Sequence, residues 1–115
     1  MEDTAYRIII MAQADQALHH IVLHVKQSFS NETAKSVYQE IKDRILLLAD
    51  NPYMGMIPRH TVLRNKNYRM LIINKNIILY RVFDDEKEVR IYNIFSQRQD
   101  YLQLRQDYLQ LLQGL

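Results

Sequence analysis

Cations and tyrosines gather in the second half of this 115-residue chain. Arg98 and Tyr101 lie just beyond the last apolar run, and Arg69 lies in an earlier one. An arginine fork donates two hydrogen bonds to one oxyanion, and a tyrosine stacks on a base or donates a hydrogen bond. Such a set can bind RNA, or cut it if one group takes the 2′-OH proton and another stabilises the pentavalent phosphate. The alternative is that Arg69 and Arg98 form structural ion pairs, for which the chain offers Asp84, Asp85 and Asp100.

The distribution of charge along the chain adds further candidate binding residues. The formal net charge is only +2, but the span between Asn51 and Phe83 contains no Asp or Glu. Besides Arg69 and Lys75, this basic span holds four candidate phosphate or nucleic-acid ligands, namely Arg59, Arg64, Lys66 and Arg81. A basic field of this kind attracts phosphates or an acidic protein. The alternative is a solvated surface whose Lys and Arg stems cover apolar atoms.

Other kinds of chemistry find little support in the chain. It has no Cys, which excludes disulfides, thiolate metal ligands and a thiol nucleophile. His20 and His24 are spaced to share a helix face, but no third ligand is evident and the Glu of the metalloprotease pattern is absent. Neither a phosphate-binding glycine loop nor a nucleophile elbow is present. We therefore expect no metal and no cofactor.

The first half of the chain must supply helices. A short Ile-rich run, Tyr6–Met11, predicts a strand, and apolar residues at helical spacing predict a helix over Asp15–Gln27. Ser30 or Asn31 can cap a second helix, which should end near Asp50 because Asn51-Pro52 follows. Two such helices joined by a short polar turn indicate a helical hairpin packed on a sheet.

The second half must supply the sheet. Three apolar runs separated by polar breaks predict an antiparallel meander of Tyr68–Ile73, Ile77–Phe83 and Val89–Phe95. The middle run is apolar on both faces, which indicates a central strand. The segment between the helices and the meander, Asn51–Asn67, reads as a loop with a short extended piece around Thr61–Arg64.

These elements predict one α+β domain over residues 1–115. An N-terminal strand and a helical hairpin pack on a mostly antiparallel sheet of about four strands, and residues 99–115 form a C-terminal helix. The apolar runs Ile8–Ala12 and Ile45–Ala49 are too short to span a membrane, and no signal peptide is evident. We therefore expect a cytoplasmic protein with no membrane partner.

The ordered set of segments resembles the RelE/ParE superfamily of bacterial toxins from type II toxin–antitoxin modules. The resemblance covers nearly the whole chain, and its clearest parts are the central strands and the ending that follows them. These read Tyr68-Arg69, Ile78-Leu79-Tyr80-Arg81-Val82, Val89-Arg90-Ile91-Tyr92-Asn93-Ile94 and Arg98-Gln99-Asp100-Tyr101, preceded by a Leu-Leu-x-x-x-Pro-x-x-Gly-like segment at Leu47–Gly55.

The resemblance implies a toxin that is neutralised by a cognate antitoxin protein. Some members of the superfamily cleave ribosome-bound mRNA, and others inhibit DNA gyrase. By position, Arg98 matches the strand-end arginine of the ribonuclease members, whereas Ile77 and Ser96 stand where such members usually have Arg and His. The Arg-x-Asp-Tyr ending is closer to the ParE-like branch. Three functions thus remain open: an mRNA endonuclease, a non-enzymatic gyrase inhibitor, and a decayed toxin that only binds its partner.

Overall fold

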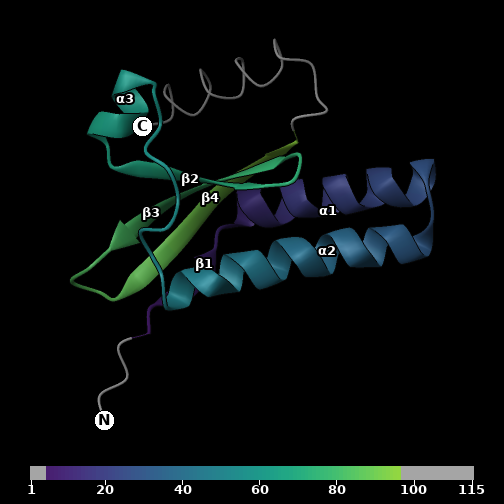
Figure 1. The fold of residues 1–115 in the computed structure, drawn as a ribbon, viewed down its shortest axis with the longest axis horizontal. Coiled ribbons are helices and arrows are strands. Elements are labelled where there is room, and N and C mark those ends of the chain that lie inside the picture. Colours follow the sequence, from purple (N-terminus) through teal and green to yellow (C-terminus); the bar gives the residue numbers. More distant parts are fainter. Residues whose placement is uncertain (1–4, 97–115) are drawn as a thin grey trace.

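The computed structural model describes residues 5–96 of the chain (Figure 1). The predicted C-terminal helix, Arg98 and Tyr101 lie outside the described residues. In chain order the elements are β1 (Arg7–Ile10), α1 (Ala12–Ser28), α2 (Asn31–Leu46), the 3-10 turn η1 (Leu47–Ala49), α3 (Thr61–Asn65), β2 (Tyr68–Ile73), β3 (Asn76–Phe83) and β4 (Glu88–Ser96).

The four strands form one mixed sheet in the order β1-β4-β3-β2. β2, β3 and β4 are the predicted antiparallel meander, and β1 pairs in parallel with β4. Two short turns join the meander, and each uses a residue at positive φ: Asn74 at 53° and Lys87 at 54°. β3 is central, which confirms the interpretation of its two apolar faces.

The two long helices form the predicted hairpin. Ser30 is the N-cap of α2, because its Oγ accepts a hydrogen bond from the Thr33 N–H at 3.1 Å. Glu32 in the first turn and Arg44 in the last turn complement the helix dipole. α2 passes into η1 and ends at Ala49, as the Asn51-Pro52 sequence predicts.

Helices cover the two faces of the sheet unequally (Figure 1). The α1–α2 hairpin buries the larger core against one face, with Leu18, Ile41 and Ile45 packed near Ile78 and Ile91. The opposite face, here called the outer face, carries a smaller cluster of Leu63, Tyr68, Ile77, Leu79 and Phe95. Among the described residues, no helix is long and apolar enough to cross a membrane.

The prediction of an extended piece at Thr61–Arg64 is wrong, because these residues begin the short helix α3. One helical turn places Leu63 on the outer face of the sheet, where it is only 1% exposed, and leaves Arg64 in solvent. An extended segment would need a strand partner for its backbone groups. Here the turn satisfies them itself, since the N–H groups of Arg64 and Lys66 donate to the carbonyls of His60 and Val62.

Tyr80 ties the loop before α3 to the sheet. Its ring is fully buried, and its hydroxyl donates to the Pro52 carbonyl and accepts from the Gly55 N–H, each at 2.9 Å. A Cβ atom at position 55 would lie 2.4 Å from the Tyr80 Oη and 2.8 Å from the Met70 carbonyl oxygen. The loop therefore approaches the sheet so closely that only glycine fits at that point.

We expect Tyr80→Phe to lower the free energy of unfolding by about 1–3 kcal/mol, because it leaves the Gly55 N–H and the Pro52 carbonyl without a partner. Urea denaturation measures the change. Tyr38→Phe is the matched control, since the Tyr38 ring is partly buried against the main core and its change should stay within about 0.5 kcal/mol. Equal stability of the two variants would contradict this role of Tyr80.

Candidate functional site

Arginines from three elements surround one cavity of about 430 Å³ at the end of the sheet near α3. Arg64 comes from α3, Arg69 from β2 and Arg81 from β3. We call this cavity, with its aromatic walls, the arginine cleft. The remaining side chains that concern its chemistry are Tyr53, Tyr68, Phe83 and Asp84.

Arg69 is partly committed to structure. Its Nη1 donates to the carbonyls of Tyr53 at 3.1 Å and Gly55 at 2.7 Å, and its guanidinium lies 4.9 Å from the centre of the Tyr53 ring. These contacts hold the loop that Tyr80 also holds. The alternative in which Arg69 pairs with Asp84 or Asp85 is wrong, because its hydrogen bonds go to backbone oxygens.

Arg81 is held by aromatic rings. Its guanidinium lies 5.4 Å from the ring centre of Tyr68 and 5.0 Å from that of Phe83, at cation–π range. Its Nε is buried and, among the described residues, has no hydrogen-bond partner; the same holds for the Tyr68 hydroxyl. Burial raises the pKa of Tyr68, so the phenol remains neutral beside this cation. A half-buried guanidinium whose Nε lacks a hydrogen-bond partner within the described residues attracts an oxyanion.

The structure divides the predicted phosphate ligands into two groups. Arg64 and Arg81 line the cleft with Arg69. Arg59 and Lys66 are exposed at the two ends of α3 and do not line it. None of the three cleft arginines forms an ion pair within residues 5–96. Among the described lining residues, three arginines therefore face one carboxylate, Asp84, and none of them forms an ion pair with it.

Asp84 is the one acidic residue among the described lining residues of the cleft. Both of its carboxylate oxygens accept hydrogen bonds from tyrosine hydroxyls. Its Oδ1 accepts from the Tyr6 hydroxyl at 2.7 Å and its Oδ2 from the Tyr53 hydroxyl at 2.5 Å. The Tyr53 hydrogen bond, followed by that of Tyr6, lowers the pKa of Asp84 below its usual range. The same hydrogen bond raises the pKa of Tyr53 to about 12. Near neutral pH Asp84 is thus ionised and Tyr53 is protonated.

The sequence predicted the arginines of the cleft but not the contacts of Tyr6 and Tyr53 with Asp84. Tyr53 and Tyr6 are distant from Asp84 along the chain, and only the folded loop and β1 bring them to the β3–β4 turn. No local pattern marks such a contact. Arg98 and Tyr101, predicted as catalytic candidates beside Arg69, stay predictions because they lie outside the described residues.

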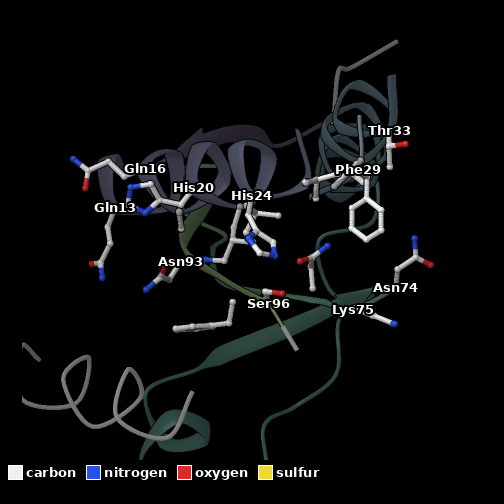
Figure 2. A pocket seen from close by; sticks show the side chains of 17 residues that line it. Gln13, Gln16, His20, His24, Phe29, Thr33, Asn74, Lys75, Asn93 and Ser96 are labelled. Carbon is white, nitrogen blue, oxygen red and sulfur yellow. Dashed lines mark hydrogen bonds between the residues drawn. The ribbon is translucent and has the colours of Figure 1, made fainter. Parts of the chain in front are cut away.

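The histidine pair of α1 lies in a different place. His20 and His24 line a second cavity between α1 and the end of β4 (Figure 2), and this cavity shares no described lining residue with the arginine cleft. Residues 5–96 contain no group of three or more His, Cys, Asp or Glu side chains that could hold a metal ion. The pair therefore has no third protein ligand of these types within the described part of the chain.

We expect Asp84→Asn to lower the pKa of Tyr53 from about 12 toward the ordinary value near 10, because the anionic acceptor is removed. In the wild-type chain, the raised pKa of Tyr53 contributes stability below about pH 10 that is lost as the pH rises through 12. The lowered pKa of Asp84 contributes stability above about pH 4 that is lost on acidification through the folded pKa.

An NMR titration of labelled tyrosine rings, assigned with Tyr53→Phe, measures the first effect. Asp85→Asn, one residue further along the same turn, is the control and should leave the titration of Tyr53 unchanged. A Tyr53 ring that still titrates near 12 in the Asp84→Asn chain would disprove the assigned cause.

Comparison with solved structures places the fold among toxin–antitoxin proteins. The chromosomal ParDE toxin–antitoxin system from P. aeruginosa aligns with a TM-score of 0.67 at 20% identity, over 81% of this chain and 97% of that one. The toxin–antitoxin complex RelBE2 from Mycobacterium tuberculosis aligns with a TM-score of 0.55 at 16% identity, over 80% of this chain and 98% of that one. At these identities the likeness concerns the fold.

Comparison of the sequence with protein-family profiles identifies the family of the chain. No curated protein sequence matches the chain significantly. The profile described as "ParE toxin of type II toxin-antitoxin system, parDE" matches residues 8–101, which run from the second residue of β1 through β4 to the segment that carries Arg98 and Tyr101. The resemblance expected from the strand sequences is confirmed, and the chain belongs to the ParE toxin family of type II toxin–antitoxin systems.

Proposed function

We propose that this toxin arrests growth as a ParE-like, non-enzymatic inhibitor of DNA gyrase, and that the arginine cleft is part of the surface that binds the target. The observation that carries the proposal is that the described part of the cleft brings three arginines together but offers no group poised to move a proton. Cleavage of RNA requires a base for the 2′-OH and an acid for the leaving group, each with a pKa near the working pH.

The ionisable groups that line the cleft within residues 5–96 do not meet that requirement. Tyr53 has a pKa of about 12, and both oxygens of Asp84 accept phenolic hydrogen bonds. The described part of the cleft is suited to binding an anion. Arg64 and Arg81 can each donate hydrogen bonds to a phosphate or a carboxylate, and Arg69 holds the loop in place.

Ribosome-dependent mRNA cleavage is the second candidate function. It is favoured by the convergence of three arginines on one cavity, which could stabilise a pentavalent phosphate. In that function Arg98 and Tyr101 would supply the groups that the described cleft lacks. A fully toxic Arg98→Ala chain would contradict it.

A cognate antitoxin is the second partner that we propose. Both solved relatives come from toxin–antitoxin systems, which supports such a partner for this chain. An acidic segment of the antitoxin should cover the arginine cleft, since opposite charge steers association and disfavours wrong partners. Charge reversal at Arg64, Lys66 and Arg69 together should then weaken the complex, and a complex insensitive to it would argue against this placement.

We expect induced expression to stop thymidine incorporation before methionine incorporation, and the double variant Arg64→Gln, Arg81→Gln to remove the effect. Loss of two charge-assisted contacts, each contributing about 1.5–3 kcal/mol, should raise the concentration that half-inhibits gyrase supercoiling at least about tenfold. The matched control is Lys35→Gln, Arg44→Gln, which removes two exposed cations of α2 away from the cleft.

Three results would point elsewhere. Arrest of protein synthesis first, with new ends in mRNA, would establish the ribonuclease function instead. Equal potency of the cleft and control variants would exclude the cleft as a target-binding surface. If neither synthesis falls, the chain is a decayed toxin that serves only as a binding module.

A further inference from the structure

The β3–β4 hairpin places two arginines directly opposite each other beside the arginine cleft. Arg81 of β3 is the register partner of Arg90 of β4. Glu88 pairs with Arg90 at 2.9 Å and also with Arg7, and no ion pair within residues 5–96 includes Arg81. Like charges directly opposite each other destabilise a pair of strands. Arg81 is therefore a cation of this sheet that lacks an anion within the described residues.

Aromatic rings hold the guanidinium of Arg81 in place. The centre of the Phe83 ring lies 5.0 Å from the Cζ of Arg81 and 3.9 Å from that of Arg90, so one ring contacts both cations. The Tyr68 ring supports Arg81 from the neighbouring strand, at 5.4 Å. A guanidinium that is already fixed loses little further freedom when it binds an oxyanion.

The Tyr68 hydroxyl is a second polar group without a partner at the same place. Tyr68 lines the cleft and is only 2% exposed, and its hydroxyl has no hydrogen-bond partner within residues 5–96. Buried hydroxyls are nearly always hydrogen-bonded, so an orphaned one indicates an ordered water or a ligand. Burial raises the pKa of Tyr68, and the hydroxyl therefore keeps a proton that it can donate.

The turn at Asn67 brings a second guanidinium to this hydroxyl. Asn67 has a positive φ of 64°, and its N–H donates to the Arg64 carbonyl at 3.0 Å. The chain turns there from α3 into β2, so Arg64 and Tyr68 line one cavity although four residues separate them along the chain. Donors from α3, β2 and β3 thus meet in the cleft.

Charge and size indicate the kind of anion that fits. The described lining holds Arg64, Arg69 and Arg81 against Asp84 alone, which leaves a formal charge of +2. A phosphomonoester has a charge between about −1.5 and −2 near pH 7 and three acceptor oxygens, whereas a carboxylate or a phosphodiester has a single negative charge. The volume of about 430 Å³ lies within the range of small-molecule pockets, about 300–1,000 Å³.

We infer that the arginine cleft binds a small phosphomonoester, with the phosphate between the guanidiniums of Arg64 and Arg81 and accepting from the Tyr68 hydroxyl. Two planar forks and one hydroxyl match the three terminal oxygens of such a group. Asp84 does not neutralise these arginines, because both of its oxygens accept hydrogen bonds from tyrosine hydroxyls. A bound phosphomonoester would also occupy the guanidiniums that an acidic protein partner needs.

Titration of the free, full-length chain with two matched probes tests the charge of the ligand. At about pH 8, above the second phosphate pKa of about 6, methyl phosphate is a dianion and dimethyl phosphate a monoanion. At constant ionic strength we expect dimethyl phosphate to bind at least about tenfold more weakly, as measured by calorimetry or NMR. Equal affinities of the two probes would overturn the inference.

Two further probes identify the source of the phosphate. Tighter binding of adenosine monophosphate than of methyl phosphate would support a nucleotide as the ligand. Equal binding of these two probes would support recognition of the phosphate group alone. A single-stranded oligonucleotide without terminal phosphates that binds more tightly than adenosine monophosphate would overturn the inference, because the cleft would then recognise a nucleic-acid backbone.

Single substitutions test the donors. Tyr68→Phe removes one hydroxyl and keeps the ring, and Arg81→Gln removes one guanidinium. We expect each to raise the dissociation constant of methyl phosphate about tenfold, since each removes a hydrogen bond to a charged group. The controls Tyr38→Phe and Arg59→Gln, at residues that do not line the cleft, should stay within about twofold. Wild-type affinity of Tyr68→Phe would overturn the inference.

The stability of the free Tyr68→Phe chain separates a binding role of the hydroxyl from a structural one. We expect this chain to be at least as stable as the wild type, because it loses only a buried hydroxyl that has no partner. Saturating methyl phosphate should raise the Tm of the wild-type chain more than that of the variant. A lower Tm of the free variant would show that the hydroxyl is bonded within the chain, and would overturn the inference.

The inference does not rest on the proposed function, because these titrations contain neither gyrase nor antitoxin. A chain that inhibits gyrase but does not bind methyl phosphate would overturn the inference and leave the proposed target in place. A chain that binds methyl phosphate but does not inhibit gyrase would support the inference and contradict the proposed target.

Discussion

The hydroxyl of Tyr80 is the contact on which the functional end of the molecule depends. It lies at the middle of the central strand and reaches the backbone of the loop at both Pro52 and Gly55. Arg69 binds the same loop from the neighbouring strand through the carbonyls of Tyr53 and Gly55. The loop carries Tyr53 to Asp84, and α3 follows it directly. Position and shape of the arginine cleft therefore follow from two side chains that fasten one loop to the sheet.

That arrangement explains how the cleft keeps its charge. An acidic residue close to several arginines would normally neutralise one of them. Here Asp84 is engaged by Tyr6 and Tyr53, and the cations rest on aromatic rings and backbone oxygens instead. Arg90, by contrast, is paired with Glu88, two residues earlier on the same strand β4, and the hydrogen bonds to Glu88 raise the pKa of Arg90. The fold thus separates a structural arginine from those available to an external anion.

The two faces of the sheet carry apolar clusters of different size. The α1–α2 hairpin buries the larger core against one face, so that face is committed to stability except where β1 stops short of the end of β4. A bulge between Leu79 and Tyr80 on β3 makes Tyr92 an extra residue on β4. Tyr92 follows the inward-facing Ile91 and so lies with Tyr68 on the outer face, with ring centres 5.4 Å apart, while the extra residue returns Ile94 to the face that the helices cover. Short β1 pairs with β4 only as far as Ile91, so among residues 5–96 no strand pairs with that side of β4 at Asn93 and Ile94.

Much of this protein can be read from its sequence, because the relevant signals are local. Apolar periodicity at Leu18–Val25 and Ile41–Leu48 marks the helices, and Ser30 before Glu32 marks the start of α2. Three apolar runs separated by polar turns mark the meander, and the absence of Asp and Glu from Asn51 to Phe83 marks the basic region. Each of these depends on neighbouring residues alone, so no knowledge of the tertiary structure is required.

The tertiary structure decided what local signals cannot carry. It made Thr61–Asn65 a helix because Leu63 finds an apolar site on the sheet, and it selected Arg64 and Arg81 for the cleft while leaving Arg59 and Lys66 beside it. It brought Tyr6 and Tyr53 to Asp84 across 78 and 31 residues of sequence. It also ended β1 at Ile10, which leaves Asn93 to bond the Ile94 N–H. These outcomes depend on contacts between distant segments, whose geometry is set only when the helices and the sheet pack together.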